Sequence, residues 1–126
     1  GLTRFIFDAE GTGHADVAWT TYSDGRLKKN RSAIPYGLSE VLALEPLIYD
    51  RYSGYIDKET EEVMLEDTSR RMMGFVAQDV KELMTELIKE IDTTESFYSL
   101  DNGSLVPVLV KAIQELTARV AALESA

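Results

Sequence analysis

The sequence has 126 residues, a formal net charge of −9 and no cysteine. Its length suits one small domain, or one domain with an appendage. The acidic balance argues against a nucleic-acid or anionic-membrane partner bound through bulk positive charge. The lack of cysteine excludes disulfides, thiolate catalysis and Cys-based metal sites.

The remaining composition excludes further classes of site. A single histidine leaves little from which to build a metal centre, so we expect no metal and no other cofactor. No apolar run approaches the ~20 residues of a membrane span, and the N-terminus lacks the pattern of a signal peptide. We therefore expect a soluble chain that is not secreted by that route.

Residues 1–22 have the pattern of short strands joined by a glycine-rich turn. An apolar strand is expected over 4–8, a turn over 10–14 and a second β-rich stretch over 17–22. Such a start is typical of the end of a β-structured fibre. We expect His14, in the turn, to be exposed and Trp19 to be buried, as large aromatic side chains usually are.

Residues 22–30 join a turn signal, a nucleophile and a candidate base. Asp24-Gly25 favours a type I′ hairpin turn, in which both central residues need positive φ. In that register Thr21 faces Lys28, and Lys28 lies diagonally across from Ser23 with Cβ atoms about 7–8 Å apart. A lysine that loses its water can take the proton of a serine, so the pair could form a Ser-Lys dyad. On spacing alone, a solvated polar hairpin is the better interpretation.

From residue 34 to residue 71 the apolar pattern changes period. Helical spacing predicts a short amphipathic helix that ends at Pro46, with Leu38, Val41, Leu42 and Leu44 on its apolar face. A strand is expected over 46–52. The acidic stretch 53–71 is interpreted as an exposed excursion of two strands with a mobile tip.

Residues 72–103 are expected to alternate strands and one helix. We predict a buried strand over 72–76, strands over 87–91 and 96–100, and a turn over 101–103. A helix is expected over 77–84, and its inner residues are Val80, Leu83 and Met84.

The C-terminal block carries a heptad pattern. Steps of three and four separate six apolar residues at a and d positions: Val106, Leu109, Ile113, Leu116, Val120 and Leu123. We predict a helix over 104–124, with Ser104 as its N-cap and Pro107 tolerated in its first turn. β-Branched residues at a with leucine at d favour two strands in a coiled coil. The alternative is a single amphipathic helix packed on its own domain. Together, the elements predict an α+β fold, a small mixed domain with a long C-terminal helix.

Three blocks in a fixed order carry a family resemblance: residues 23–30, 74–80 and 105–116. Over about residues 17–126 the chain resembles the self-cleaving C-terminal intramolecular chaperone of bacteriophage tailspikes, tail fibres, neck appendages and endosialidases. The resemblance implies that residues 1–22 end an upstream fibre and that residues 23–126 are the chaperone domain. It also implies a homotrimer in which the helix over 104–124 forms a three-stranded coiled coil.

The resemblance implies a single-turnover serine endopeptidase with a Ser-Lys dyad, in which Ser23 is the nucleophile and Lys28 the general base. Cleavage in cis would break the Tyr22–Ser23 bond through an N→O acyl shift, because a serine cannot attack its own carbonyl without a strained ring. Attack by a serine of another protomer could break Ser23–Asp24.

Three further residues have supporting roles in this interpretation. Asp24 and Arg26 would shape the loop or orient the base, and Asn30 would cap the turn. The domain would trimerise and fold its own upstream fibre in the host cytoplasm during phage assembly. It would then be released, and the upstream part would join the virion tail or appendage.

Two other classes of function remain open. The chain could be a trimerisation module that does not cleave, with Ser23 as an ordinary turn residue. It could also be a receptor- or glycan-binding fibre tip, as Trp19 and the tyrosine-rich stretch 49–55 would allow.

Overall fold

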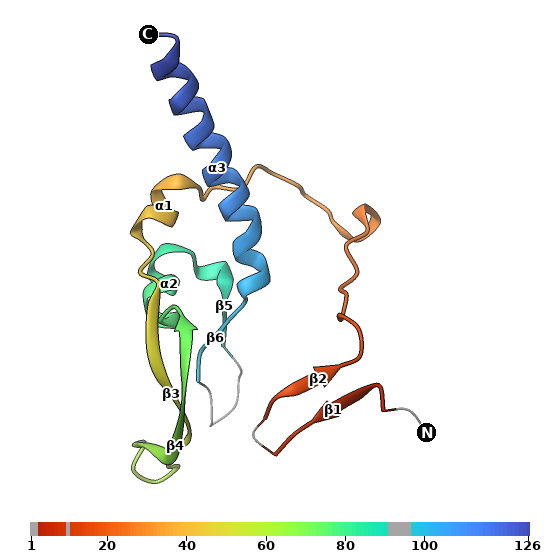
Figure 1. Cartoon of the computed structure of the whole chain (residues 1–126), viewed down its shortest axis with the longest axis vertical. Helices are drawn as coiled ribbons and strands as arrows, with labels where there is room; N and C mark the ends of the chain where they lie inside the picture. Colours follow the sequence, from red (N-terminus) through yellow and green to blue (C-terminus); the bar gives the residue numbers. More distant parts are fainter. Residues whose placement is uncertain (1–2, 10, 91–96) are drawn as a thin grey trace. The chain divides into compact units, whose positions relative to one another are not determined.

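The computed structural model describes residues 3–9, 11–90 and 97–126. Within these ranges it holds three two-stranded antiparallel sheets and three α-helices, one of them long and C-terminal (Figure 1). The predicted α+β class is therefore confirmed. The chain divides into two compact units, Gly1–Ala33 and Ile34–Ala126. No helix in the described ranges has both the length and the apolar character that crossing a bilayer requires.

The first unit is built on a small antiparallel ribbon. β1 (Phe5–Phe7) pairs with β2 (Gly13–Ala15), so the expected strand over 4–8 is confirmed. His14 lies in β2 and not in the turn, and it is exposed as expected. Its Nε2 atom lies 3.0 Å from Oδ2 of Asp8, which ties the ribbon to the turn that precedes it.

Two expectations for the first unit are wrong. Residues 17–22 form no strand, and the ribbon ends where Ala15 pairs with Phe5. Trp19 is 74% exposed, and its ring meets only the edge of Phe7, with ring centroids 6.4 Å apart. The unit has too little apolar mass to cover a side chain of this size.

A short helix and a long hairpin begin the second unit. α1 (Leu38–Ala43) lies inside the predicted range, and its first turn is closed by the Glu40 carboxylate, which accepts from the Gly37 amide at 2.7 Å. Leu38 is buried, whereas Leu42, which was predicted on the apolar face, is exposed.

β3 (Leu47–Ile56) pairs with β4 (Val63–Gly74), with an irregularity in register between Tyr52 and Gly54. The strand expected over 46–52 is confirmed but extends to Ile56, and the exposed stretch 53–71 holds the end of β3 and most of β4 rather than two strands of its own. The buried strand expected over 72–76 is wrong, because β4 continues to Gly74 as part of the exposed hairpin and Met73 is 81% exposed.

The core of the second unit gathers around α2 (Ala77–Leu83), which confirms the predicted helix. The buried cluster consists of Val80, Met84, Leu87, Leu105 and Val108. Val80 and Met84 face inward as expected, and Leu83 is half-buried. A 3₁₀ turn, η2 (Thr85–Leu87), leads from α2 into the last sheet.

The last sheet is shorter than expected. β5 (Ile88–Lys89) pairs with β6 (Ser99–Leu100) inside the predicted ranges. The expected strand ends at Ile91 and Ser96 lie outside the described residues.

The long helix α3 (Asn102–Glu124) begins two residues earlier than predicted. The expected turn over 101–103 and the expected N-cap at Ser104 are wrong, because Asp101 is the cap. The Asp101 carboxylate accepts from the Ser104 amide at 3.3 Å and from the Ser104 hydroxyl at 2.6 Å. Leu105, Val108 and Ala112 form the face of α3 that is buried on its own domain, where α1 packs against it (Figure 1).

Candidate functional site

The segment that was expected to be a hairpin is a single 3₁₀ turn, η1 (Gly25–Leu27). Asp24 caps the turn with φ −62° and ψ 133°, and its carboxylate accepts from the Arg26 amide at 2.9 Å. The type I′ hairpin is therefore wrong, and with it the pairing of Thr21 with Lys28 across a ladder. An aspartate side chain that accepts from nearby main-chain N–H groups competes with sheet pairing. Here the Asp24 carboxylate stabilises a 3₁₀ turn in place of the hairpin.

The 3₁₀ turn nevertheless brings Ser23 and Lys28 together. The Lys28 amide donates to the Gly25 carbonyl at 3.1 Å, which returns the chain toward its starting point. The Lys28 ammonium Nζ then donates to the Ser23 hydroxyl Oγ. Both residues are exposed in this chain. The candidate nucleophile and the candidate base are thus in direct contact, through a different turn from the one expected.

Asp24 and Arg26 form a tight ion pair beside this contact. The Arg26 guanidinium donates from Nε to Oδ1 at 3.1 Å and from Nη2 to Oδ2 at 2.8 Å, a two-pronged arrangement that fixes both side chains. Hydrogen bonds from the Arg26 side chain and amide lower the pKa of Asp24 below its usual value, and Asp24 in turn raises the pKa of Arg26. The two residues thus shape the loop and do not touch the Ser23 hydroxyl in any recorded bond of the described residues.

Lys28 is the C-cap of the turn, and Asn30 and Arg31 follow it. Asn30 has φ 55°, the left-handed conformation that asparagine adopts more readily than most residues. After this reversal the Arg31 side chain donates to the carbonyls of Gly25 and Lys28. Sequence reasoning missed Arg31. The available signal was a long cationic side chain placed directly after a residue that tolerates positive φ.

The proposed cleavage flank is open to its surroundings. Tyr22, which would provide the acyl group, is 92% exposed and lies outside any helix or strand, just before the turn. The arrangement suits attack on the chain's own backbone.

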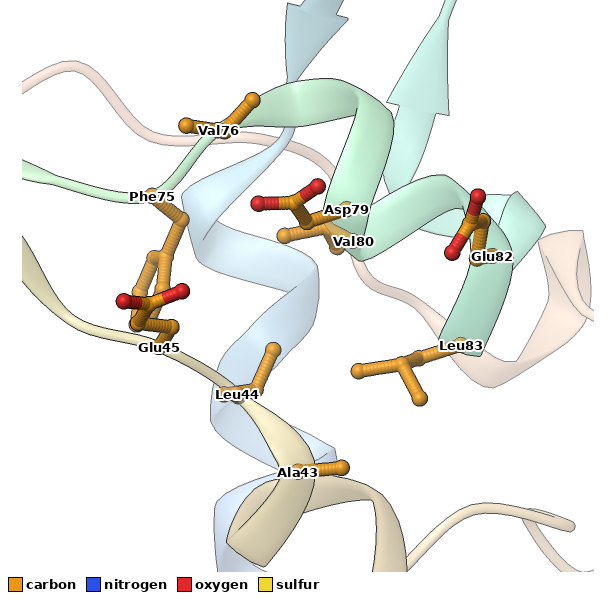
Figure 2. A pocket seen from close by; sticks show the side chains of 9 residues that line it. All are labelled: Ala43, Leu44, Glu45, Phe75, Val76, Asp79, Val80, Glu82 and Leu83. Atoms are coloured by element: carbon orange, nitrogen blue, oxygen red, sulfur yellow. The ribbon is translucent and has the colours of Figure 1, made fainter.

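An open pocket of about 260 Å³ lies in the second unit, between the end of α1 and α2. Figure 2 shows its apolar side chains together with the carboxyl groups of Glu45, Asp79 and Glu82. Its lining includes no serine, lysine or histidine, so it provides neither a nucleophile nor a base for acyl transfer. Among the described residues no cluster of His, Cys, Asp and Glu has the size and spacing of a metal site.

The predicted a and d residues lie on the side of α3 that its own domain leaves uncovered. Each is between 39% and 77% exposed: Val106, Leu109, Ile113, Leu116, Val120 and Leu123. Beyond Glu115, every residue of the helix is exposed. An apolar stripe at heptad spacing is therefore accessible to another chain.

Comparison with known families gives a match that begins at Ser23. The model of the peptidase S74 family, described as the chaperone of endosialidase, matches residues 23–89. The match starts at Ser23 and includes the whole loop, α1, the β3–β4 hairpin and α2. No curated protein sequence matches the chain. With more than half of its length covered by the family model, the chain belongs to the chaperone of endosialidase family.

Proposed function

We propose that the chain is an intramolecular chaperone that gathers three copies of a phage tail fibre, tailspike or appendage and is then released by autoproteolysis next to Ser23. One observation carries this proposal. The Lys28 ammonium donates to the Ser23 hydroxyl at the very start of the region that matches a peptidase family of chaperones. The proposed setting is the host cytoplasm during phage assembly, and the upstream part would remain in the virion.

The chemistry follows from that contact. Lys28, in its neutral form, takes the proton of the Ser23 hydroxyl, and Oγ attacks the carbonyl carbon of Tyr22. The Tyr22–Ser23 amide bond breaks, Lys28 returns the proton to the departing Ser23 nitrogen, and an ester joins Tyr22 to Oγ. Water then hydrolyses the ester, which leaves a Tyr22 carboxylate and restores the Ser23 hydroxyl. The reaction happens once per chain and needs no cofactor.

A second geometry uses two protomers. Ser23 of one chain would attack the carbonyl carbon of Ser23 in another, and the Ser23–Asp24 bond would break. The new N-terminus distinguishes the two routes, because the released domain starts at Ser23 in the first and at Asp24 in the second.

Exposure of the dyad explains why assembly would be required. A lysine amine acts as a base only in its neutral form, which removal of water favours. Ser23 and Lys28 are both exposed in the single chain. In the proposal, the folded fibre and the neighbouring chains exclude water from the loop, so cutting follows assembly.

The uncovered stripe of α3 supports trimer formation. From Leu116 to Glu124 every residue of the helix is exposed. A short helix without packing is only marginally stable in water, because most helical stability comes from burial of an apolar face. Three such helices would bury their stripes against one another, as the family resemblance implies.

Holding three chains together would speed the slow step of fibre folding, which is the pairing of different chains. Interwoven fibres fold slowly, because their contacts are non-local and lie between chains. A domain that holds three chains together raises their effective concentration and aligns their register. Cutting after assembly would remove the chaperone domain, so the fibre could not refold once it had come apart. The stability of the fibre would then depend on its rate of unfolding and not on an equilibrium.

Mass spectrometry of the full-length polypeptide tests the proposal. We expect the wild type to yield a C-terminal fragment that starts at Ser23, and we expect Ser23→Ala to remain intact while it still trimerises. Ser32→Ala is a matched control, because it removes the same hydroxyl nine residues away from an exposed position, and it should be cut normally. If Ser23→Ala were cut at the wild-type rate, the proposed function would be contradicted.

Exposed aromatic residues favour one second candidate. Phe5, Phe7 and Trp19 are each at least 60% exposed in the first unit, as a receptor- or glycan-binding fibre tip would require. Glycan binding by the uncut polypeptide, abolished by Trp19→Ala but not by Ser23→Ala, would favour this function. An intact wild-type trimer would instead favour a module that does not cleave.

A further inference from the structure

Arg31 lies just beyond the motif and reaches back to both ends of the 3₁₀ turn. Its Nη2 atom donates to the Gly25 carbonyl at 3.0 Å, and its Nε atom donates to the Lys28 carbonyl at 3.3 Å. The guanidinium is a rigid plane with donors at fixed separation. Two bonds from one plane therefore fix the spacing between the start of the turn and the backbone of Lys28.

Gly25 leaves room for this clamp. A Cβ atom built on Gly25 would lie 2.8 Å from Nη2 of Arg31, which is closer than real Cβ contacts come. Any side chain at position 25 would therefore displace the guanidinium. Asn30 adopts the left-handed conformation, with φ 55°, and the chain bends there. The Arg31 side chain, which follows this bend, lies over the turn.

We propose that Arg31 is a positioning residue for self-cleavage, which fixes the Lys28 amine against the Ser23 hydroxyl by holding the carbonyls of Gly25 and Lys28. This inference rests on the proposed function. Within the described residues Arg31 donates to the carbonyls of Gly25 and Lys28 and not to the Ser23 hydroxyl, so it acts through the backbone of the base and not on the reacting atoms. The loop on its own is short and exposed, with no buried residue to hold it.

The first test compares cleavage rates of full-length variants. Arg31→Ala should slow cutting by about 10- to 100-fold, because a misplacement of about 1 Å can cost about 100-fold in rate. Arg31→Lys keeps a cation that reaches one carbonyl but cannot span both, so its rate should be intermediate. Lys29→Ala is the matched control, since it removes the same charge beside the loop, and it should be cut at the wild-type rate.

Three results would overturn the inference. These are wild-type cutting of Arg31→Ala, equal rates for the Lys and Ala variants, and an equal loss in Lys29→Ala, which would mean that net charge matters and position does not. Circular dichroism and light scattering accompany each rate, and both should be unchanged, because Arg31 is exposed and lies outside the core. Should Arg31→Ala fail to fold, the Lys variant and Gly25→Ala decide the question.

The second test is a double-mutant cycle. Gly25→Ala should slow cutting as Arg31→Ala does, because both remove the same clamp. The double variant should then be no slower than the slower single variant. A double variant whose loss is the product of the two single losses would show that the residues act independently, and the clamp would be refuted.

Ser23→Ala, measured beside these variants, separates the two proposals. If Ser23→Ala is cut like the wild type, the proposed function itself fails. If Ser23→Ala is uncut and Arg31→Ala is cut at the wild-type rate, only the role of Arg31 fails.

Discussion

Lys28 has two tasks that a substitution can separate. As an ammonium it donates to the Ser23 hydroxyl, and in the proposed reaction its neutral form accepts the hydroxyl proton. Arginine can donate but does not lose its proton in proteins. We expect Lys28→Arg and Lys28→Ala both to leave the full-length polypeptide uncut while trimers still form, as seen in a time course on denaturing gels. Efficient cutting of Lys28→Arg would mean that no base is needed at this position.

The Asp24–Arg26 pair makes the loop sensitive to acid. Bonds from Arg26 hold the pKa of Asp24 below its usual value of 3.8. A carboxyl whose pKa is lower in the folded than in the unfolded chain stabilises the fold above the unfolded value, and this contribution is lost as pH falls through the folded value. The contribution of the pair to the loop should therefore be complete above pH 3.8 and should be lost as pH falls through the lower pKa that Asp24 has in the folded chain.

An NMR titration of the Asp24 side-chain carboxyl measures this effect. Arg26→Ala should move the midpoint upward toward 3.8, because the side-chain bond to Arg26 is the largest cause of the shift. An unchanged midpoint in Arg26→Ala would contradict the assigned cause.

For single residues, the sequence predicted that Ser23 and Lys28 would meet, but it did not predict the turn that brings them together. Ser23 and Lys28 are five positions apart, so several kinds of turn can bring them together. Asp24-Gly25 favours a hairpin only where flanking strands pair, and here the Asp24 carboxylate caps a 3₁₀ turn instead. Arg31 was missed because its role depends on three-dimensional closure of the loop.

Among the elements, α3 presents two faces that a matched pair of substitutions can distinguish. Val108 is 1% exposed in the core, whereas Val106 is 56% exposed on the heptad stripe. Val108→Asp buries a carboxylate and should cost at least the about 2–5 kcal/mol of a large-to-small core change. Val106→Asp should leave the monomer's melting temperature nearly unchanged. Thermal melting at low protein concentration measures both, and equal losses would refute the two-faced helix.

Heptad periodicity predicted which residues of α3 remain uncovered, but it could not show the second face. Leu105, Val108 and Ala112 also lie at helical spacing, and only the positions of α1 and α2 show that these residues are the ones buried in the chain. The helix therefore packs on its own domain and still leaves its heptad stripe free. The two alternatives drawn from the sequence are not exclusive.

For the whole molecule, the proposed trimer depends on side chains that the single chain does not use. Ile113 and Leu116 are 63% and 50% exposed, so Ile113→Asp with Leu116→Asp should leave the domain folded. Like charges brought together at a three-fold seam repel, and only protonation or separation relieves them. We expect monomers by light scattering, misassembled fibres, and loss of cutting in parallel although Ser23 and Lys28 are intact. A stable trimer of this variant would show that α3 is not the interface.

The bonds that hold the cleavage loop join residues no more than six positions apart, from Ser23 to Arg31. A loop of about 10 residues closes in about 10–100 ns, whereas subunits assemble in milliseconds to minutes. The loop therefore forms long before a second chain arrives, so its formation would not set the time of the proposed release. In the proposed reaction the delay would therefore reside in the chemical step, which would wait for surroundings that the lone chain lacks. A newly made chain would already hold Lys28 against Ser23, and the water around both exposed residues would keep it from cutting.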